Sequence, residues 1–388
     1  MVWGGEKIAP FKGVETTQDH IGESWELSAY PTKESVVANG PLAGRNIADL
    51  VREYKGALIG EKVYANTGDE FPLLIKFIDA KSDLSIQVHP DDAMAEKHHP
   101  GQKGKTEMWY VVDADPGAHL YSGLKESITP EEYEARIAND TITEVLADFQ
   151  VKPGDVFFLP AGRIHAICGG CFIAEIQQTS DLTYRIYDYG RLGLDGKPRQ
   201  LHTELAKEAI DYKVYPDYKT VYEPRKDEEV EVVSCQYFTT SVLNLDKPFT
   251  KDLSGLDSFL VVMCTSGSGT VSLAAEAPTT SAAAVAPTPE GKVSGKLTLP
   301  GTSPSGCTDP AHPGCPGSDS TDPAHAVPIR QGETVLIPAC ATAVTFTPDV
   351  MPGKTGLIPA CASAMTFTPD VMPGKTGHPL TLVTSCIK

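Results

Sequence analysis

Residues 154–165, with the sequence GDVFFLPAGRIH, constrain the fold of this chain more than any other stretch. Gly154 can adopt the positive φ of a tight turn, and the apolar run after it is typical of a short buried strand. Pro160 cannot donate a hydrogen bond to a sheet, so it ends the strand, and Gly162 lets the chain bend back. The spacing therefore predicts a hairpin whose returning strand carries His165 toward the interior of a barrel. The alternative is an ordinary hairpin in which the histidine has no special role.

Length and charge limit the classes of protein to consider. The chain has 388 residues, enough for two domains, and 41% of them are hydrophobic, as in a typical globular protein. Its net charge is −18, whereas a protein that binds nucleic acid or an anionic membrane needs a basic face, so we expect neither partner. The first residues lack the apolar core of a signal peptide, and no run of about 18 apolar residues occurs. We therefore predict a cytoplasmic protein.

Two motifs that suggest chemistry can be set aside. Cys168 and Cys171 form a CxxC pair, but no second pair completes a zinc site, and the nine scattered cysteines do not suggest a disulfide framework. We interpret this pair as structural. Residues 101–106, GQKGKT, resemble a phosphate-binding loop. The motif needs a glycine five residues before Gly104, where this chain has His99, so we reject nucleotide binding here.

Residues 84–90, LSIQVHP, alternate as a strand does. The apolar side chains share one face and the polar side chains Ser85, Gln87 and His89 share the other. Taken alone, this pattern is typical of a strand whose polar face meets water. The alternative is that the polar face lines a cavity, where Gln87 and His89 point toward one ion. Glu107, in the strand TEMWYVV, would then supply a carboxylate between the histidines.

The remaining pattern of the first half mixes strands with short helices. We expect strands at residues 71–78, 172–178 and 184–188, and helices at residues 46–58, 128–149 and 201–210. Asn46 is a plausible N-cap of the first helix. Thr129 and Pro130 are suited to begin the second helix.

Five motifs then occur in a fixed order. They are WGG at residues 3–5, LSIQVHPDD at 84–92, GKTEMWYV at 104–111, PAGRIHAI at 160–167 and EIQQTSDLTYRIYDYGR at 175–191. Because these motifs occur in this order, residues 3–220 resemble the bacterial type I mannose-6-phosphate isomerases, which are zinc enzymes of the cupin superfamily. The resemblance implies one Zn²⁺ per chain, a sugar phosphate substrate, and interconversion of mannose 6-phosphate and fructose 6-phosphate through an enediol.

The resemblance also assigns roles to particular residues. It implies four metal ligands, which are Gln87, His89, Glu107 and His165. It implies that Ser85 and Arg185 contact the substrate phosphate, and that the catalytic residues are Arg185, Lys105 and Glu175. Lys105 or Arg185 would stabilise the oxyanion, and Glu175 or a zinc-bound water would move the proton. The sequence leaves open which group is the base.

The resemblance implies a mainly β fold with two cupin-like jelly-roll barrels. Residues 1–220 would form the catalytic domain, with a helical insertion at about 126–149, and residues 227–388 a second domain without a His/Glu set. In the second domain, residues 275–326 are rich in Ala, Pro, Ser, Thr and Gly, which predicts a mostly disordered insert. Residues 336–356 and 357–377 are near-identical copies, spanning 336–377, and we expect one copy to occupy the strands.

Two rival functions follow from the same residues. A cupin dioxygenase would hold iron on a similar His/Glu set, and a storage-type cupin would bind sugars without a metal or turnover. Gln87 among the ligands, together with Ser85, Lys105 and Arg185, disfavours the dioxygenase. The intact ligand set disfavours the storage protein. We expect a monomer or a homodimer, and the sequence does not distinguish them.

Overall fold

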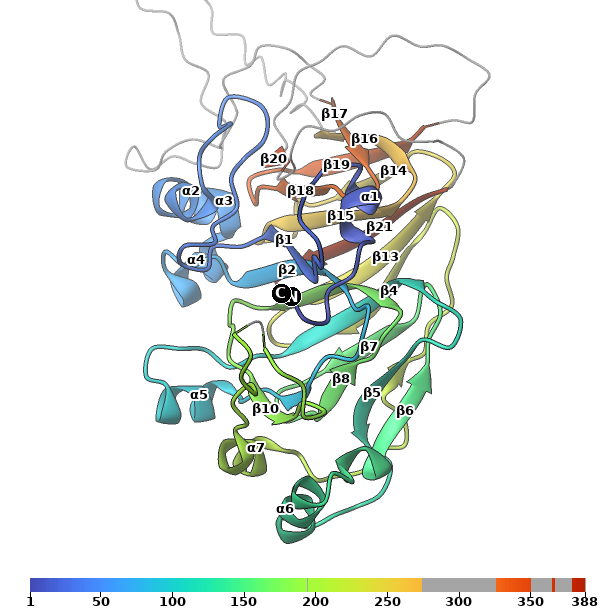
Figure 1. Ribbon diagram of the computed structural model, residues 1–388. Helices are drawn as coiled ribbons and strands as arrows, with labels where there is room; N and C mark the ends of the chain where they lie inside the picture. The colour runs from blue at the N-terminus through green and yellow to red at the C-terminus, as the bar shows by residue number, and fades with distance from the viewer. Residues whose placement is uncertain (194, 274–325, 350–364, 367–378, 388) are drawn as a thin grey trace, which may run out of the picture.

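The computed structural model describes residues 1–193, 195–273, 326–349, 365–366 and 379–387. Its strands form four sheets that stack as layers, with helices at the sides and at one end (Figure 1). The fold is mainly β, as expected from the sequence. In the described part of the chain, no helix is long and apolar enough to cross a membrane.

Two sheets from the first part of the chain form what we call the first sandwich. The six-stranded sheet has the order β1-β2-β9-β4-β7-β11, and the five-stranded sheet has the order β10-β3-β8-β5-β6. Trp109 and Ile173 of the larger sheet share a buried core with Leu120 and Ile167 of the smaller sheet. The strands are β1 Glu23–Leu27, β2 Leu73–Asp79, β3 Ile86–Val88, β4 Glu107–Ala114, β5 His119–Leu124, β6 Leu146–Gln150, β7 Val156–Leu159, β8 His165–Ile167, β9 Cys171–Gln178, β10 Tyr184–Tyr187 and β11 Lys219–Thr220.

Two further sheets form the second sandwich. Their orders are β12-β13-β21-β15-β18-β20 and β14-β19-β16-β17, and their cores include Leu260 of one and Phe346 of the other. The order of the six-stranded sheet repeats that of the first sandwich strand for strand. The strands are β12 Glu229–Ser234, β13 Thr239–Leu245, β14 Phe249–Asp252, β15 Leu260–Ser266, β16 Ser268–Leu273, β17 Ala326–Arg330, β18 Thr334–Ile337, β19 Ala343–Pro348, β20 Met365–Thr366 and β21 Leu380–Cys386.

The two six-stranded sheets pack against each other through their outer faces. Met108 and Ile176 of the first sandwich lie in one buried cluster with Val261 and Val383 of the second. Every residue of β2 and β9 is buried, because each strand has a core on both faces. This explains their nearly continuous apolar sequences, since a strand covered on both sides does not alternate between apolar and polar residues.

The helices are short. They are α1 Ile8–Lys12, α2 Ile47–Tyr54, α3 Gly56–Ile59, α4 Glu61–Thr67, α5 Asp92–His98, α6 Pro130–Ala138, the 3₁₀ helix η1 Ile142–Val145, and α7 Thr203–Ala209. The Asn46 side chain caps α2 by accepting from the Asp49 N–H, as expected. The helix expected over residues 46–58 is broken at Lys55, whose positive φ of 50° separates α2 from α3.

The helix expected over residues 128–149, and with it a helical insertion reaching residue 149, is wrong beyond its first part. Thr129 and Glu132 form a capping box at the start of α6, but the helix ends at Ala138. Asp140 has a φ of 58°, which stops the helix. The end of the range is strand β6, which pairs with β5, and Phe149 packs edge-on against Phe157. Tertiary pairing therefore overrides the helical pattern there.

The two unusual segments of the second half lie mostly outside the described residues. Ser272 of β16 pairs with Ala326 of β17, so Ala326 belongs to a strand and the insert ends before it. The two ends of the insert therefore meet in one hairpin, while residues 274–325 lie outside the description. The first repeat copy contributes Leu336 and Ile337 to β18 and supplies β19; Met365–Thr366 of the second copy pairs with β18. The expectation that only one of the two copies occupies the strands stays a prediction.

Candidate active site

A single line of side chains crosses the five-stranded sheet of the first sandwich. Arg185 lies opposite Gln87, Gln87 lies opposite His165, and His165 lies opposite Ser122. Directly opposed residues share a face of a sheet, so the four side chains project to the same side. His89 and Ser85, two residues to either side of Gln87, are 2% and 3% exposed. The polar face of β3 is therefore buried, and the interpretation as a water-facing strand is wrong.

Glu107 reaches the same place from the facing sheet. Its Oε2 lies 3.5 Å from His89 Nε2, and its Oε1 lies 3.3 Å from His165 Nε2. One ligand atom from each of His89, Glu107 and His165 lies within 4.8 Å of the others. The Gln87 amide lies beside them, with its nitrogen 3.4 Å from His165 Nε2. The structure thus brings together four residues that the sequence motifs place up to 78 positions apart.

Both imidazoles are fixed in the orientation that a metal ligand needs. His89 Nδ1 donates to the Leu182 carbonyl and His165 Nδ1 donates to the Arg163 carbonyl, each at 2.8 Å. Each Nε2 is then left with a lone pair directed at Glu107. Burial lowers the pKa of both histidines, that of His165 to about 3, so both rings are neutral.

The carboxylate between the rings is ionised. Burial opposes its charge, but the Lys105 ammonium holds the pKa of Glu107 well below its usual range. Among the described residues, His89 Nε2 and Glu107 Oε1 are buried without a hydrogen bond, and Glu107 Oε2 has the Lys105 ammonium at 2.8 Å. Two neutral imidazoles and a carboxylate with unused acceptor sites fit a divalent cation, which would satisfy them all.

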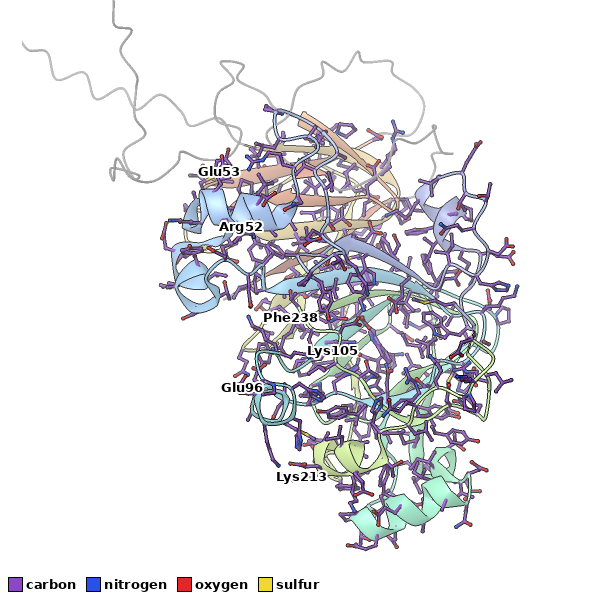
Figure 2. The ribbon with its side chains drawn as sticks, turned by 60° about the vertical axis from the view of Figure 1, so that its left-hand side comes forward. Arg52, Glu53, Glu96, Lys105, Lys213 and Phe238 are labelled. Atoms are coloured by element: carbon purple, nitrogen blue, oxygen red, sulfur yellow. The ribbon has the colours of Figure 1, made fainter. Side chains whose placement is uncertain are left out.

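Lys105 and Glu175 extend the cluster into an alternating series of charges. Lys105 Nζ lies 2.8 Å from Glu107 Oε2 and 4.0 Å from Glu175 Oε1. Lys76 Nζ lies 3.4 Å from the same Glu175 oxygen, and Trp109 Nε1 donates to the other at 3.0 Å. Figure 2 labels Lys105 among the strands at the middle of the molecule. Lys76 was not among the site residues predicted from the sequence, although a lysine within the buried run LLIKFID was a usable signal.

These contacts set the protonation of the two catalytic candidates. Burial lowers the pKa of Lys105, but Glu107 and Glu175 more than compensate and raise it, so its ammonium stays charged. Burial, reinforced by the charge of Glu107, raises the pKa of Glu175. A carboxyl group with a raised pKa accepts and releases protons more readily near neutral pH than an ordinary glutamate.

Arg185 lies at one end of the line, in a group of three arginines. Its Nη1 donates to the Gln200 carbonyl at 2.9 Å, while its Nε is buried without a partner among the residues described. Asp188, the neighbour most able to neutralise it, is instead bonded by Arg191 and Arg199. Burial and then the charge of Arg199 lower the pKa of the Arg185 guanidinium. Arg191 and Arg199 were not among the site residues predicted from the sequence.

The CxxC pair takes no part in this site. Cys168 and Cys171 are free and buried. Burial raises the pKa of both thiols, that of Cys171 to about 12, so neither is a reactive thiolate. Their interpretation as structural cysteines fits these surroundings.

Two jelly-roll sandwiches with a His/Glu cluster inside the first define a cupin-fold protein with a candidate metal site. Residues 1–116 match the family model of the catalytic domain of type I phosphomannose isomerases. The mannose-6-phosphate isomerase ManA of Bacillus subtilis is 36% identical over 270 residues, which cover 69% of this chain and 83% of ManA. The chain therefore belongs to the mannose-6-phosphate isomerase family.

Two further comparisons agree with this assignment. The probable mannose-6-phosphate isomerase GmuF of Bacillus subtilis is 42% identical over 209 residues, but the match spans 54% of this chain and 64% of GmuF. The crystal structure of the mannose 6-phosphate isomerase from Bacillus subtilis superposes with a TM-score of 0.70 at 26% identity, covering 99% of this chain and 96% of that one. The likeness to solved structures thus extends over both sandwiches.

Proposed function

We propose that this chain interconverts mannose 6-phosphate and fructose 6-phosphate through an enediol, with one Zn²⁺ in the first sandwich. The observation that carries the proposal is the buried cluster of His89, Glu107 and His165, whose donor atoms lie within 4.8 Å of one another. Family membership supports the reaction, because the relatives reported above are named for it.

Gln87, His89, Glu107 and His165 would hold the ion. Neutral imidazoles, a carboxylate and an amide oxygen are ligands that suit Zn²⁺. When bound, such an ion acts as a Lewis acid toward an oxygen of the substrate. The carbonyl groups that fix both histidine rings keep the donors in place before any ion arrives.

The substrate phosphate would lie near Ser85 and Arg185. A chain with a net charge of −18 needs a local cation to bind a dianion, and Arg185 is not paired with the nearby Asp188. Its buried Nε is a donor without a protein partner among the described residues. Arginine offers a fixed fork of donors that matches phosphate oxygens.

Glu175 and Lys105 are the residues we assign to proton transfer and charge stabilisation. The reaction moves a proton between C1 and C2 of the sugar. The Glu175 carboxylate would take the proton from one carbon and return it to the other, a role that its raised pKa favours. The buried ammonium of Lys105 would stabilise the negative charge that develops on the sugar oxygen.

Metal analysis combined with a coupled isomerase assay tests this function. We expect about one zinc per chain and isomerase activity that a chelator removes and added zinc restores. His165→Gln should lower zinc content and activity together. His119→Gln is a matched control, because His119 is a half-exposed residue paired with Asp148 outside the site. Sugar binding without metal or turnover, or iron with oxygen consumption and no isomerisation, would favour a rival cupin function. Isomerase activity without any metal would contradict the zinc assignment.

The domain division, the cellular location and the oligomeric state expected from the sequence stay predictions. We propose that residues 1–220 form the catalytic domain and residues 227–388 a second, non-catalytic domain. We also propose a cytoplasmic location. Light scattering of the purified chain would distinguish a monomer from a homodimer.

A further inference from the structure

The second sandwich contains a cavity of about 500 Å³, far along the chain from the residues of the candidate active site. This volume is in the range of sites that bind small molecules. The lining residues come from both sheets and from the turn after β14. They are Glu229, Glu231, Thr239, Ser241, Lys251, Asp252, Gly255, Leu256, Leu260, Thr384 and Cys386.

Cross-strand pairing relates this cavity to the active site of the first sandwich. In the first sandwich one row runs through Trp25, Lys76, Glu175, Trp109 and Phe157. In the second, the corresponding row runs through Glu231, Ser241, Thr384, Val262 and Val335. The two rows cross strands that have the same positions in the two sheets.

The same pairing shows which residues of the second sandwich correspond to Glu107 and Glu175. Glu107 begins β4 and lies opposite Leu159, the last residue of β7. Leu260 begins β15 and lies opposite Ile337, the last residue of β18. Leu260 thus corresponds to Glu107, while Thr384 corresponds to Glu175. The cavity of the second sandwich thus has the position of the candidate active site, with Leu260 in place of Glu107.

Hydroxyl and charged side chains supply the polar part of the cavity lining. Thr384 is 1% exposed, and neither it nor Ser241 makes a side-chain hydrogen bond within the described ranges. These hydroxyl groups line the cavity, where each can donate a hydrogen bond to a ligand and accept one from it. Lys251 Nζ is bonded to Glu229 at 2.6 Å, which leaves further hydrogen-bonding sites on both groups.

We propose that this cavity binds an uncharged sugar or sugar alcohol about the size of a hexose. Carboxylates accept hydrogen bonds from neighbouring sugar hydroxyls, the Lys251 ammonium donates one, and Leu256 and Leu260 offer an apolar surface to the C–H groups of the ligand. The lining has three carboxylates and one ammonium, so a sugar phosphate is repelled. The ligand therefore differs in charge from the substrate proposed for the first sandwich.

Methyl NMR on the full chain with labelled leucines tests the proposal. The probes are D-mannose, D-mannitol and mannose 6-phosphate, and the signals are the methyl groups of Leu256 and Leu260. We expect saturable shifts with the two uncharged probes and none with the phosphate. No saturable shift with either uncharged probe overturns the proposal. So do shifts that vanish when mannose 6-phosphate fills the catalytic site, since the sugar would then bind there.

Thr384→Val sharpens the test, because it keeps the shape of the side chain and removes the hydroxyl. We expect binding to weaken about three- to tenfold, with the midpoint of thermal unfolding unchanged or raised. Glu231→Gln should also weaken binding. If Thr384→Val does not fold, the affinity of the Glu231→Gln variant tests the proposal instead. Glu228 is exposed and precedes the lining residue Glu229 in the chain, so it is the matched control. The Glu228→Gln variant should bind the uncharged sugars as the wild type does. If the Thr384→Val and Glu231→Gln variants bind the uncharged sugars with the same affinity as the Glu228→Gln control, the proposal is overturned.

Discussion

The two six-stranded sheets have the same strand order but differ in the side chains at the centre of the faces that line their sandwiches. In the first sandwich, Lys76 and Glu175 are buried next to each other in one row, with Trp109 donating to Glu175. In the second, Ser241 and Thr384 have the corresponding positions and carry no charge. The same backbone pairing thus supports a buried pair of charges in one half and two uncharged hydroxyl side chains at the corresponding positions in the other.

The difference shows which part of each sheet determines the fold. The outer faces of both sheets meet in one apolar cluster, where Met108 and Ile176 pack near Val261 and Val383. Their burial stabilises the arrangement whatever lines the inner faces. Buried charges are tolerated on an inner face only when each has a partner, as Lys105 has in Glu107. The inner rows can therefore differ while the fold is kept.

The largest effect should come from making the first sandwich like the second at its central position. Glu107→Leu introduces the residue of the corresponding position and should abolish metal binding and isomerase activity. Metal affinity should fall by more than about 100-fold, because losing even a group that supports a ligand costs 10–100-fold. Lys105 would stay buried without its partner at 2.8 Å, lowering the free energy of unfolding by about 3–5 kcal/mol.

Metal analysis and thermal denaturation check this prediction. Leu260→Met, a similar-sized change at the corresponding position, is the control and should leave zinc content and isomerase activity unchanged. A Glu107→Leu variant that keeps its zinc would show that the cluster is not the metal site.

A smaller effect is expected from Glu175→Gln, which removes the proton-accepting group and keeps the shape of the side chain. We expect kcat to fall about 100- to 10⁴-fold with KM little changed, because acid–base catalysis contributes that much. Zinc content should stay at the wild-type value, since Glu175 is not among the proposed ligands. Steady-state kinetics of the metal-loaded variant measure this. Activity within a few-fold of the wild type would transfer the role of base to another group.

Arg185→Ala should lower isomerase activity less than Glu175→Gln does. Loss of one charge-assisted hydrogen bond to the phosphate costs about 1.5–3 kcal/mol, or roughly 10- to 150-fold in kcat/KM. The zinc content should not change. Arg225→Ala, at an exposed arginine in the segment before the second sandwich, should leave kcat/KM unaltered. An Arg185 variant with wild-type kcat/KM, or one that loses zinc in step with activity, would contradict the assignment.

The smallest effect should follow from deleting residues 275–325 and joining β16 to β17 by a short turn. Ser272 and Ala326 are cross-strand partners, so the hairpin can close without the insert. The isomerase kcat/KM should be unchanged and the thermal midpoint unchanged or raised, because each halving of a loop lowers its closure cost by about 0.6 kcal/mol. A large loss of folded protein would show that the insert packs on the second sandwich.

The sequence alone predicted features that depend on local chemistry. The positive φ of Gly154 is confirmed, and so are the strand after it and the returning strand that carries His165. Gly162, where the chain was expected to bend back, also has a positive φ. The Asn46 cap and the capping of α6 by Thr129 are confirmed as well. Each follows from turn, strand or cap preferences of residues within a few positions of one another, so a single sequence is enough to predict it.

Tertiary structure decided what depends on residues far apart in the chain. Residues 146–150 became strand β6 because β5 pairs with them, against the helical pattern of their sequence. Lys76 joined the buried charge cluster of the candidate active site because β2 pairs with β9 and brings it opposite Glu175. The correspondence between Glu107 and Leu260 is visible only through the pairing of β4 with β7 and of β15 with β18. Register between distant strands is fixed by packing across the whole molecule, and no local pattern encodes it.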